Sequence, residues 1–149
     1  MTNLNKEQIK NLLPHREPML LIDELKDIKK LFSATAIVNV KKNSFFVNGH
    51  FPGEPVMPGV LIVEAFGQAA AALTANGLDK TTYDNKLVFL MTIEKAWFRN
   101  PVIPDCVLEL MIEAVRSHGR VWKYKGTAFV GDKKMADAQW SATIVDRKK

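Results

Sequence analysis

Apolar residues fill almost every position of residues 59–76, and this run predicts one long helix. Before Thr74, only Glu64 and Gln68 interrupt it with strongly polar side chains. A helix that is apolar on nearly all sides is enclosed by other elements instead of lying on a surface. Gly77 stands where a helix C-terminal cap is expected, so the helix is predicted to end there.

Alternating apolar and polar positions, rich in β-branched residues, predict strands through most of the remaining chain. One strand is expected before the long helix and five after it, at residues 31–40, 86–93, 96–98, 107–115, 120–130 and 134–145. Short glycine-containing turns at residues 117–119 and 131–133 predict antiparallel hairpins between the last three strands. A short amphipathic helix is expected at residues 5–13, and residues 43–58, rich in Gly, Pro and Asn, are expected to form a functional loop.

These elements predict a fold of the α+β class, in which a largely antiparallel sheet wraps around one central helix. The length of 149 residues predicts a single domain spanning residues 1–149. Composition agrees, because 47% of the residues are hydrophobic and 25% are charged, as in ordinary globular proteins. Cys106 is the only cysteine, which excludes an internal disulfide and fits a reducing, cytoplasmic location.

The net charge of +5 narrows the classes of binding partner that we expect. The basic residues are scattered, and zinc-finger, P-loop and RNA-recognition signatures are absent, so an acidic protein partner is favoured over nucleic acid. The N-terminus lacks the features of a secretory signal. No membrane association is expected either, because the longest apolar run, residues 56–74, is interrupted by Pro58, Gly59, Glu64, Gly67 and Gln68.

Glu64 is the first candidate for chemistry, since a carboxylate in an apolar helix is costly unless it is paired or protonated. Desolvation favours the protonated form, which suits a general acid near neutral pH. Gln68, four residues further along, shares a helix face with Glu64 and would equally satisfy a purely structural carboxylate. The helix alone supports both interpretations to the same degree.

His50 and Gly59 shift this balance toward catalysis. His50 lies in the sequence GHFPG, and Pro55 and Pro58 stiffen the path from it into the helix. Histidine is the side chain best suited to proton transfer at neutral pH. Gly59 begins the helix, where unpaired N–H groups can bind a carbonyl oxygen as negative charge develops on it. A base, an acid and an oxyanion donor suit elimination beside a carbonyl group, with no metal or cofactor.

The other two histidines are not expected to take part in this chemistry. His15 follows Pro14 in a loop and is expected to be structural, while His118 in a hairpin turn is expected to be solvated. The three histidines and Cys106 are too dispersed along the chain to form a recognisable metal-ligand motif.

Three motifs resemble the FabZ-type 3-hydroxyacyl-[acyl-carrier-protein] dehydratases of bacterial type II fatty-acid synthesis. The first and most specific is GHFPGEPVMPGVL at residues 49–61, followed by Glu64 and Gln68. The second is LPHR at residues 13–16, with Pro18 and then LLID at residues 20–23. The third is FRNPV at residues 98–102, with Pro104. They occur in the family's order and span nearly the whole chain.

The resemblance implies a hot-dog fold, with an antiparallel sheet wrapped around a long central helix. It implies a homodimer, commonly assembled as three dimers, whose active sites each take the histidine from one subunit and the glutamate from the other. In the implied mechanism His50 removes the C2 proton of a (3R)-3-hydroxyacyl thioester, while the Gly59 N–H polarises the thioester carbonyl. Glu64, directly or through water, helps the C3 hydroxyl leave, giving a trans-2-enoyl thioester on an acidic acyl carrier protein.

The resemblance also suggests roles for less specific positions. Gln68 is a supporting residue for Glu64, and Arg99 is a candidate contact for the carrier protein, with a solvated surface arginine as the alternative. Apolar residues near the helix are candidates for lining an acyl tunnel, with plain core as the alternative for each: Phe51, Val60 and Phe66. The sequence departs from the family at three places, which puts loop geometry, tunnel shape or carrier docking in doubt: Glu17, Trp97 and Asp105-Cys106.

Three other functions compete with this interpretation. A related dehydratase that also isomerises the double bond typically carries aspartate at the helix position, so Glu64 favours dehydration alone. A hot-dog acyl thioesterase would hydrolyse the thioester, and the His50 loop argues against it. A carrier-binding module without activity is disfavoured by the intact pair of His50 and Glu64.

Overall fold

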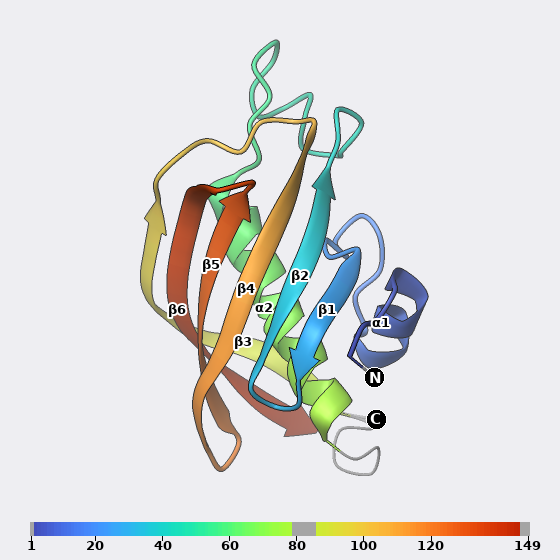
Figure 1. Cartoon of the computed structure of the whole chain (residues 1–149), viewed down its shortest axis with the longest axis vertical. Helices are drawn as coiled ribbons and strands as arrows, with labels where there is room; N and C mark the ends of the chain where they lie inside the picture. The colour runs from blue at the N-terminus through green and yellow to red at the C-terminus, as the bar shows by residue number, and fades with distance from the viewer. Residues whose placement is uncertain (1, 79–85, 147–149) are drawn as a thin grey trace.

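Six antiparallel strands form one sheet that curves around a long helix in the computed structural model, which describes residues 2–78 and 86–146 (Figure 1). The strand order across the sheet is β1-β2-β4-β5-β6-β3, so β1 and β3 are the two edges. Figure 1 shows α2 lying along the concave side of this sheet, with α1 beside β1. The elements in chain order are α1 (Lys6–Leu12), β1 (Glu24–Lys29), β2 (Ser33–Val40), α2 (Gly59–Gly77), β3 (Lys86–Phe98), β4 (Cys106–His118), β5 (Val121–Val130) and β6 (Lys133–Asp146).

Tight turns set the register of the last three strands. His118 pairs with Val121 and Val130 pairs with Lys133, so each hairpin has a two-residue loop. The first loop residue is Gly119 or Gly131, with φ of 62° and 59°, respectively. A residue with a side chain rarely adopts this left-handed conformation, so glycine at these positions selects the turn and with it the pairing.

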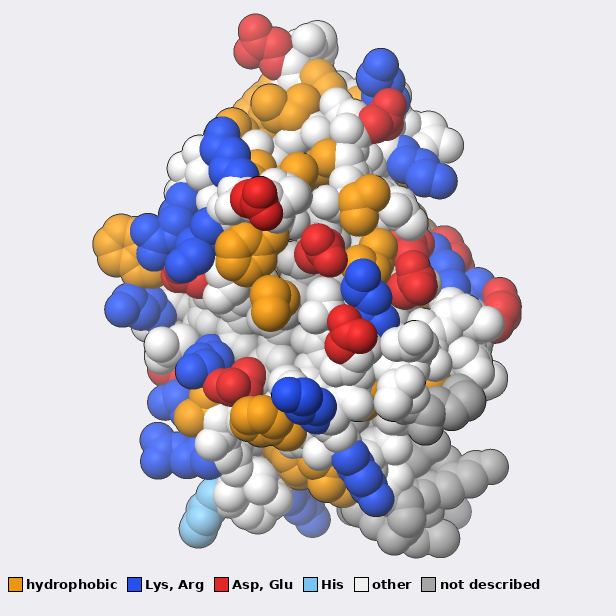
Figure 2. All heavy atoms as spheres, viewed as in Figure 1, with side chains coloured by type: hydrophobic (Ala, Val, Ile, Leu, Met, Phe, Trp, Pro, Cys, Tyr) orange, Lys and Arg blue, Asp and Glu red, His pale blue; other side chains and the backbone are white. Residues whose placement is uncertain are grey.

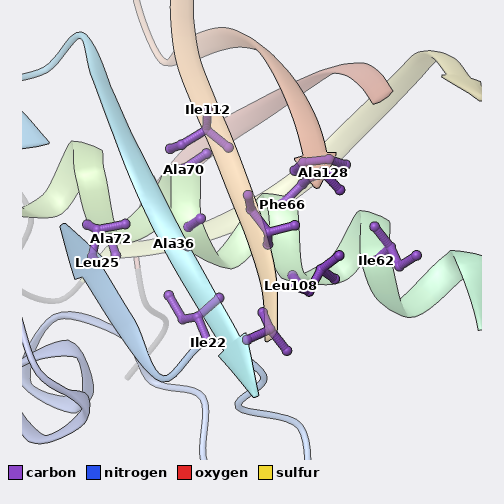
Figure 3. Close-up of a cluster of buried hydrophobic side chains, with 14 of the residues drawn as sticks. Ile22, Leu25, Ala36, Ile62, Phe66, Ala70, Ala72, Leu108, Ile112 and Ala128 are labelled. Carbon is purple, nitrogen blue, oxygen red and sulfur yellow. The ribbon is translucent and has the colours of Figure 1, made fainter. Parts of the chain in front are cut away.

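The core lies between α2 and the concave face of the sheet. In Figure 3, Phe66 of α2 lies beside Leu108 of β4 and Ala128 of β5. Phe66 and Leu108 have no exposed surface. Gly126 of β5 makes room for the ring, because a Cβ there would lie only 2.7 Å from two ring atoms of Phe66. Burying a side chain of this size contributes about 2–3 kcal/mol to stability, so this contact anchors the helix firmly on the sheet.

The α+β class and the hot-dog arrangement expected from the sequence are confirmed. Helix α1 is fixed at its start by a capping box, in which the Asn5 side chain accepts from the Gln8 N–H and the Gln8 side chain accepts from the Asn5 N–H. Strand β1 was not expected. Only Leu25 and Ile28 of its six residues are buried, so the usual strand alternation is missing.

Two expectations about strand and helix ends are wrong. The strands expected at 86–93 and 96–98 are one strand, β3, interrupted by irregularities in its pairing with β6. Helix α2 ends at Gly77, one residue later than expected, and its C-cap is Leu78 in an extended conformation, so Gly77 is not the cap. Glycine is required at position 77 because a Cβ there would lie only 2.5 Å from the Leu31 side chain.

One stripe of α2 is left uncovered by the fold. Val60 is 76% exposed, and Glu64 and Gly67, at helical spacing from it, are partly exposed. Most of the helix between residues 62 and 75 is buried, so the exposed stripe corrects the expectation that the helix is enclosed on every side. Helix α2 is long and apolar enough to match a membrane span, but 67% of its most apolar window is buried inside the fold, as in a core helix.

Strand β3 forms a second surface that the fold leaves uncovered. It is an edge of the sheet, and large apolar side chains along it are about half exposed: Phe89, Leu90, Met91, Ile93, Trp97 and Phe98. The face of the sheet turned away from α2 differs, because acidic and basic side chains are interspersed with apolar ones there (Figure 2). Basic side chains are most frequent along the left margin of this view.

Candidate active site

The orientation of His50 is set by its own loop. Its Nδ1 atom lies 2.8 Å from the carbonyl oxygen of Val56. A carbonyl oxygen only accepts hydrogen bonds, so Nδ1 carries the hydrogen and Nε2 keeps a free lone pair in the neutral ring. The Val56 N–H donates to the His50 carbonyl oxygen at 2.7 Å, and the Phe51 ring stacks on the imidazole with centroids 4.0 Å apart. The loop therefore presents a histidine in the tautomer that can accept a proton.

An open groove of about 440 Å³ runs past His50 and the beginning of α2. Gly59 and Val60 line one side of it, and the segment from Phe98 to Val102 lines the other. The loop and this segment are joined by a hydrogen bond from the Met57 N–H to the Val102 carbonyl oxygen, 2.8 Å long. The structure therefore brings His50 and Gly59, two of the predicted site residues, into one groove.

Gly59 is placed where the groove meets the positive end of the helix. The N-cap residue, Pro58, offers no side-chain hydrogen bond, and within residues 2–78 and 86–146 the N–H groups of Gly59 and Val60 have no acceptor. A Cβ at 59 would lie 2.9 Å from the Phe98 ring, so glycine is needed for this close approach. The arrangement leaves backbone donors free to bind an oxygen on which negative charge develops.

Glu64 is less buried than its sequence context suggests, with 35% of its side chain exposed on the uncovered stripe of α2. Its Oε2 atom accepts a hydrogen bond of 2.8 Å from Gln68 Nε2. Gln68 itself is 1% exposed. Its Oε1 accepts from the Leu21 N–H and its Nε2 also donates to the Met19 carbonyl oxygen, at 2.8 and 2.7 Å. The predicted pairing of Gln68 with Glu64 is thus present and is tied to the segment before β1.

His15 also lies beside Glu64, which the sequence reasoning missed. Its Nε2 is 3.7 Å from Glu64 Oε2, and both residues line a small cavity of about 50 Å³ beneath the uncovered stripe. They are 49 positions apart in the chain, so the periodicity of the sequence could not predict this contact. The available signal was the motif LPHR at residues 13–16, which was matched to a family without a role for its histidine.

His50 and Glu64 do not share a cavity within one chain. His50 lines the groove at the start of α2, whereas Glu64 lines the small cavity with His15. Val60 lines the groove, and Glu64 lies one helical turn further along the same uncovered stripe, outside the groove lining. The carboxylate therefore faces the surface that the fold leaves open, next to the groove of its own chain.

The remaining predicted residues divide between surface and core. Phe51 is 53% exposed and lies against His50, and Val60 is on the groove wall. Phe66 is a core residue stacked on Trp140, with ring centroids 5.3 Å apart. Arg99 lines the groove and donates to Asp137 Oδ2 from two nitrogens, at 2.8 and 3.1 Å, so it is held by an ion pair instead of being freely solvated.

The departures from the family's sequence have clear structural partners. A backbone hydrogen bond lowers the pKa of the Glu17 carboxyl, and ion pairs with Lys6 and Lys10 of α1, at 3.3 and 3.4 Å, lower it further. Arg99 lies over the Trp97 ring, 5.7 Å from its centroid. Asp105 accepts a hydrogen bond of 2.8 Å from a loop N–H, and burial raises the pKa of the Cys106 thiol.

Among the residues that the structure describes, no group of three or more His, Cys, Asp or Glu side chains could hold a metal ion. His118 is exposed at the end of β4, as expected for a solvated residue. The groups available for chemistry at the groove are therefore an imidazole and backbone N–H donors, and the carboxylate of Glu64 lies on the neighbouring open surface.

Comparison with known proteins identifies close relatives over nearly the whole chain. The FabA-like domain family matches residues 13–139. A protein of Myxococcus xanthus named 3-hydroxyacyl-[acyl-carrier-protein] dehydratase FabZ is 48% identical over 140 residues, covering 94% of this chain and 91% of that protein. One of the same name from Gluconobacter oxydans is 49% identical over 138 residues, covering 93% and 81%.

Solved structures agree on the fold at much lower identity. The dehydratase heterocomplex ApeI:P from Xenorhabdus doucetiae superposes with a TM-score of 0.79 at 16% identity, covering 95% of this chain and 91% of that one. A sigma28-regulated virulence protein from Campylobacter jejuni gives a TM-score of 0.69 at 18% identity, covering 95% and 90%. At such low sequence identities, the structural agreement supports only a shared fold.

Proposed function

The chain belongs to the FabA-like family, and on that premise we propose that it dehydrates (3R)-3-hydroxyacyl-[acyl-carrier-protein] to the trans-2-enoyl thioester. Relatives at 48% and 49% identity bear the name of this activity, and they match at nearly full length. The observation that carries the assignment of the base is the orientation of His50. Its Nδ1–H donates to the Val56 carbonyl oxygen, so Nε2 keeps the lone pair that can accept a proton from the substrate.

The proposed reaction begins with the C–H bond next to the thioester carbonyl. His50 Nε2 takes the C2 proton, and the carbonyl oxygen, bound by the Gly59 N–H, carries the charge that develops. The electron pair from C2 forms the double bond to C3 as the C3–O bond breaks. Glu64, directly or through water, supplies the proton with which the hydroxyl departs as water. Between turnovers, His50 releases its proton to solvent and Glu64 takes up a proton from solvent.

A homodimer completes this site in the proposal. His50 and Glu64 of one chain open onto different cavities, so the acid for each groove comes from the second copy. Two uncovered surfaces support a contact between copies: the half-exposed apolar side chains of edge strand β3 and the stripe of α2 that carries Glu64. Three such dimers in one assembly are the further expectation, which size-exclusion chromatography with light scattering tests.

The substrate's carrier is an acidic acyl carrier protein in this proposal. The chain's charge of +5 favours its approach, and Arg99, held by Asp137 at the groove wall, is the proposed contact. An Arg99→Glu variant should then raise KM for a carrier-bound substrate much more than for a short pantetheine thioester. Equal effects on both substrates would remove Arg99 from docking. The reducing cytoplasm expected from the single cysteine remains part of the proposal.

The deciding experiment is a spectroscopic assay of 3-hydroxyacyl-carrier dehydration over several chain lengths. His50→Ala should lower the rate by about 10²–10⁴, the usual contribution of a general base, while the dimer stays intact. Glu64→Gln should also impair turnover strongly. His118→Ala, at an exposed histidine, is the matched control and should keep the wild-type rate. Full dehydration by His50→Ala would refute the base assignment.

The same preparation separates the competing activities. Incubation with a trans-2-decenoyl thioester should give no cis-3 isomer, because the proposed enzyme only dehydrates. A thiol reagent should detect no free thiol released from an acyl thioester, because the proposed site has no hydrolytic role. Formation of the isomer would assign the bifunctional enzyme, and release of thiol would assign a thioesterase.

A further inference from the structure

The side chains of Gln68 and His15 both approach the same oxygen of Glu64. Gln68 Nε2 donates to Oε2 at 2.8 Å, and His15 Nε2 lies 3.7 Å from that atom. In the described part of the chain, the other oxygen, Oε1, has no hydrogen-bond partner. One oxygen of the carboxyl group is thus held by the protein, and the other is available to a ligand.

The backbone that carries His15 is fixed on helix α1. Arg16 Nη1 donates to the carbonyl oxygens of Leu13 and His15, at 2.9 and 2.6 Å, and Nη2 donates to the Lys10 carbonyl oxygen at 3.1 Å. Glu17 forms ion pairs with the same helix. The backbone at His15 is therefore held in place in the loop between α1 and β1 by its contacts with α1.

The buried side of the ring indicates which nitrogen carries the hydrogen. His15 Nδ1 is buried and has no hydrogen-bond partner among residues 2–78 and 86–146. A buried N–H without an acceptor is rare in proteins, whereas an unused acceptor is less costly. The neutral ring therefore keeps its lone pair on Nδ1 and its hydrogen on Nε2, the atom that faces Glu64.

We propose that His15 is a positioning residue for Glu64: its Nε2–H and the Gln68 amide together hold Oε2, so that Oε1 carries the proton delivered to the departing hydroxyl. This inference rests on the proposed dehydration. As Glu64 loses its proton, the carboxylate that forms is stabilised by both donors, and the 3.7 Å separation shortens to a hydrogen bond. Because this charge develops only during the reaction, His15 affects kcat and leaves substrate binding unchanged.

The test replaces the imidazole by side chains that keep or lose a donor at the right place. An asparagine has its amide nitrogen near the position of the imidazole Nδ1, so His15→Asn should lower kcat about tenfold, or about 1.4 kcal/mol, at unchanged KM. His15→Gln places its amide near Nε2 and should recover most of that loss. His118→Asn, the same substitution at an exposed histidine, should keep wild-type kinetics. Equal kcat in His15→Asn and wild type would overturn the proposal.

A double variant distinguishes action through Glu64 from a general effect on folding. In a Glu64→Gln background, His15→Asn should cause no further loss of the residual rate, because the group it acts on is already gone. A full tenfold loss in that background would overturn the proposal. Near-normal turnover of Glu64→Gln alone would instead refute the proposed acid, so the two failures are distinguishable.

Nuclear magnetic resonance tests the arrangement without any substitution. With ¹⁵N-labelled histidine, the wild-type protein should show an unprotonated Nδ1 and a protonated Nε2 at His15. His50 should show the opposite tautomer, because its Nδ1–H donates to Val56. An unprotonated Nε2 at His15 would contradict the donor role whatever the variants do.

Discussion

Gln68 connects the candidate acid to the fold, and its removal should be measurable in both stability and rate. Gln68→Leu keeps the size of a fully buried side chain but deletes its hydrogen bonds to Leu21, Met19 and Glu64. Ordinary hydrogen bonds contribute about 1 kcal/mol each, and one to a carboxylate about 2 kcal/mol. The expected loss of unfolding free energy is therefore about 4 kcal/mol, and the expected fall in Tm is about 10 °C for a chain of this size.

Urea unfolding followed by tryptophan fluorescence measures this loss, because Trp140 is 1% exposed and will report on unfolding. Wild type and variant must be compared at one protein concentration, since association stabilises the folded state by mass action. Gln139→Leu provides the matched control, as Gln139 is exposed on β6, and should stay within about 0.5 kcal/mol of wild type.

The dehydration rate provides the second readout of the same variant. Without the amide, Glu64 Oε2 loses its one hydrogen bond shorter than 3 Å, so turnover of the folded Gln68→Leu protein should fall. A loss below about 1 kcal/mol in the urea measurement would refute the reasoning, because the three hydrogen bonds could then not be holding the segment before β1 against the helix.

Three further outcomes follow from the packing and the titrating groups. Gly126→Ala places a Cβ 2.7 Å from the Phe66 ring and should cost about 1–3 kcal/mol in unfolding free energy; an unchanged urea midpoint would contradict the contact. Burial raises the pKa of Tyr124 to about 12, so the folded state keeps its proton while the unfolded chain ionises near pH 10. Stability should therefore decrease as pH rises between these values, and Tyr124→Phe should flatten that decrease in thermal melts. Burial also raises the pKa of Cys106, so its reaction with a thiol reagent should be slow at neutral pH and accelerate in alkali; fast labelling at pH 7 would contradict this.

The long helix and the last three strands could be predicted because each is specified locally. Apolar residues on nearly every side of α2 require a surrounding sheet, and Gly119 and Gly131 select two-residue hairpins. Strand β1 lacks such a local signal, since Leu25 and Ile28 are three residues apart and its pairing is set by β2. Gly77 was misinterpreted because its reason is a neighbour, Leu31, that no local pattern reveals.

The candidate site divides in the same way between local and distant information. The loop around His50 and the helix start at Gly59 adjoin in sequence, so their meeting in one groove could be expected. The contact of His15 with Glu64 joins two segments across the fold and could not. The exposure of Glu64 was missed for a further reason, because an apolar sequence does not distinguish a side covered by the chain's own sheet from one left open.

The irregular pairing of β3 with β6 affects the tendency of this protein to form fibres. An exposed, flat, apolar edge is a template for endless strand addition, as in amyloid fibres. In β3 the regular ladder is broken between Leu90 and Thr92 and again between Ile93 and Lys95, so no long flat stretch is offered to an unrelated strand. In the proposed homodimer, a second copy covers this edge and leaves it closed to further strand addition.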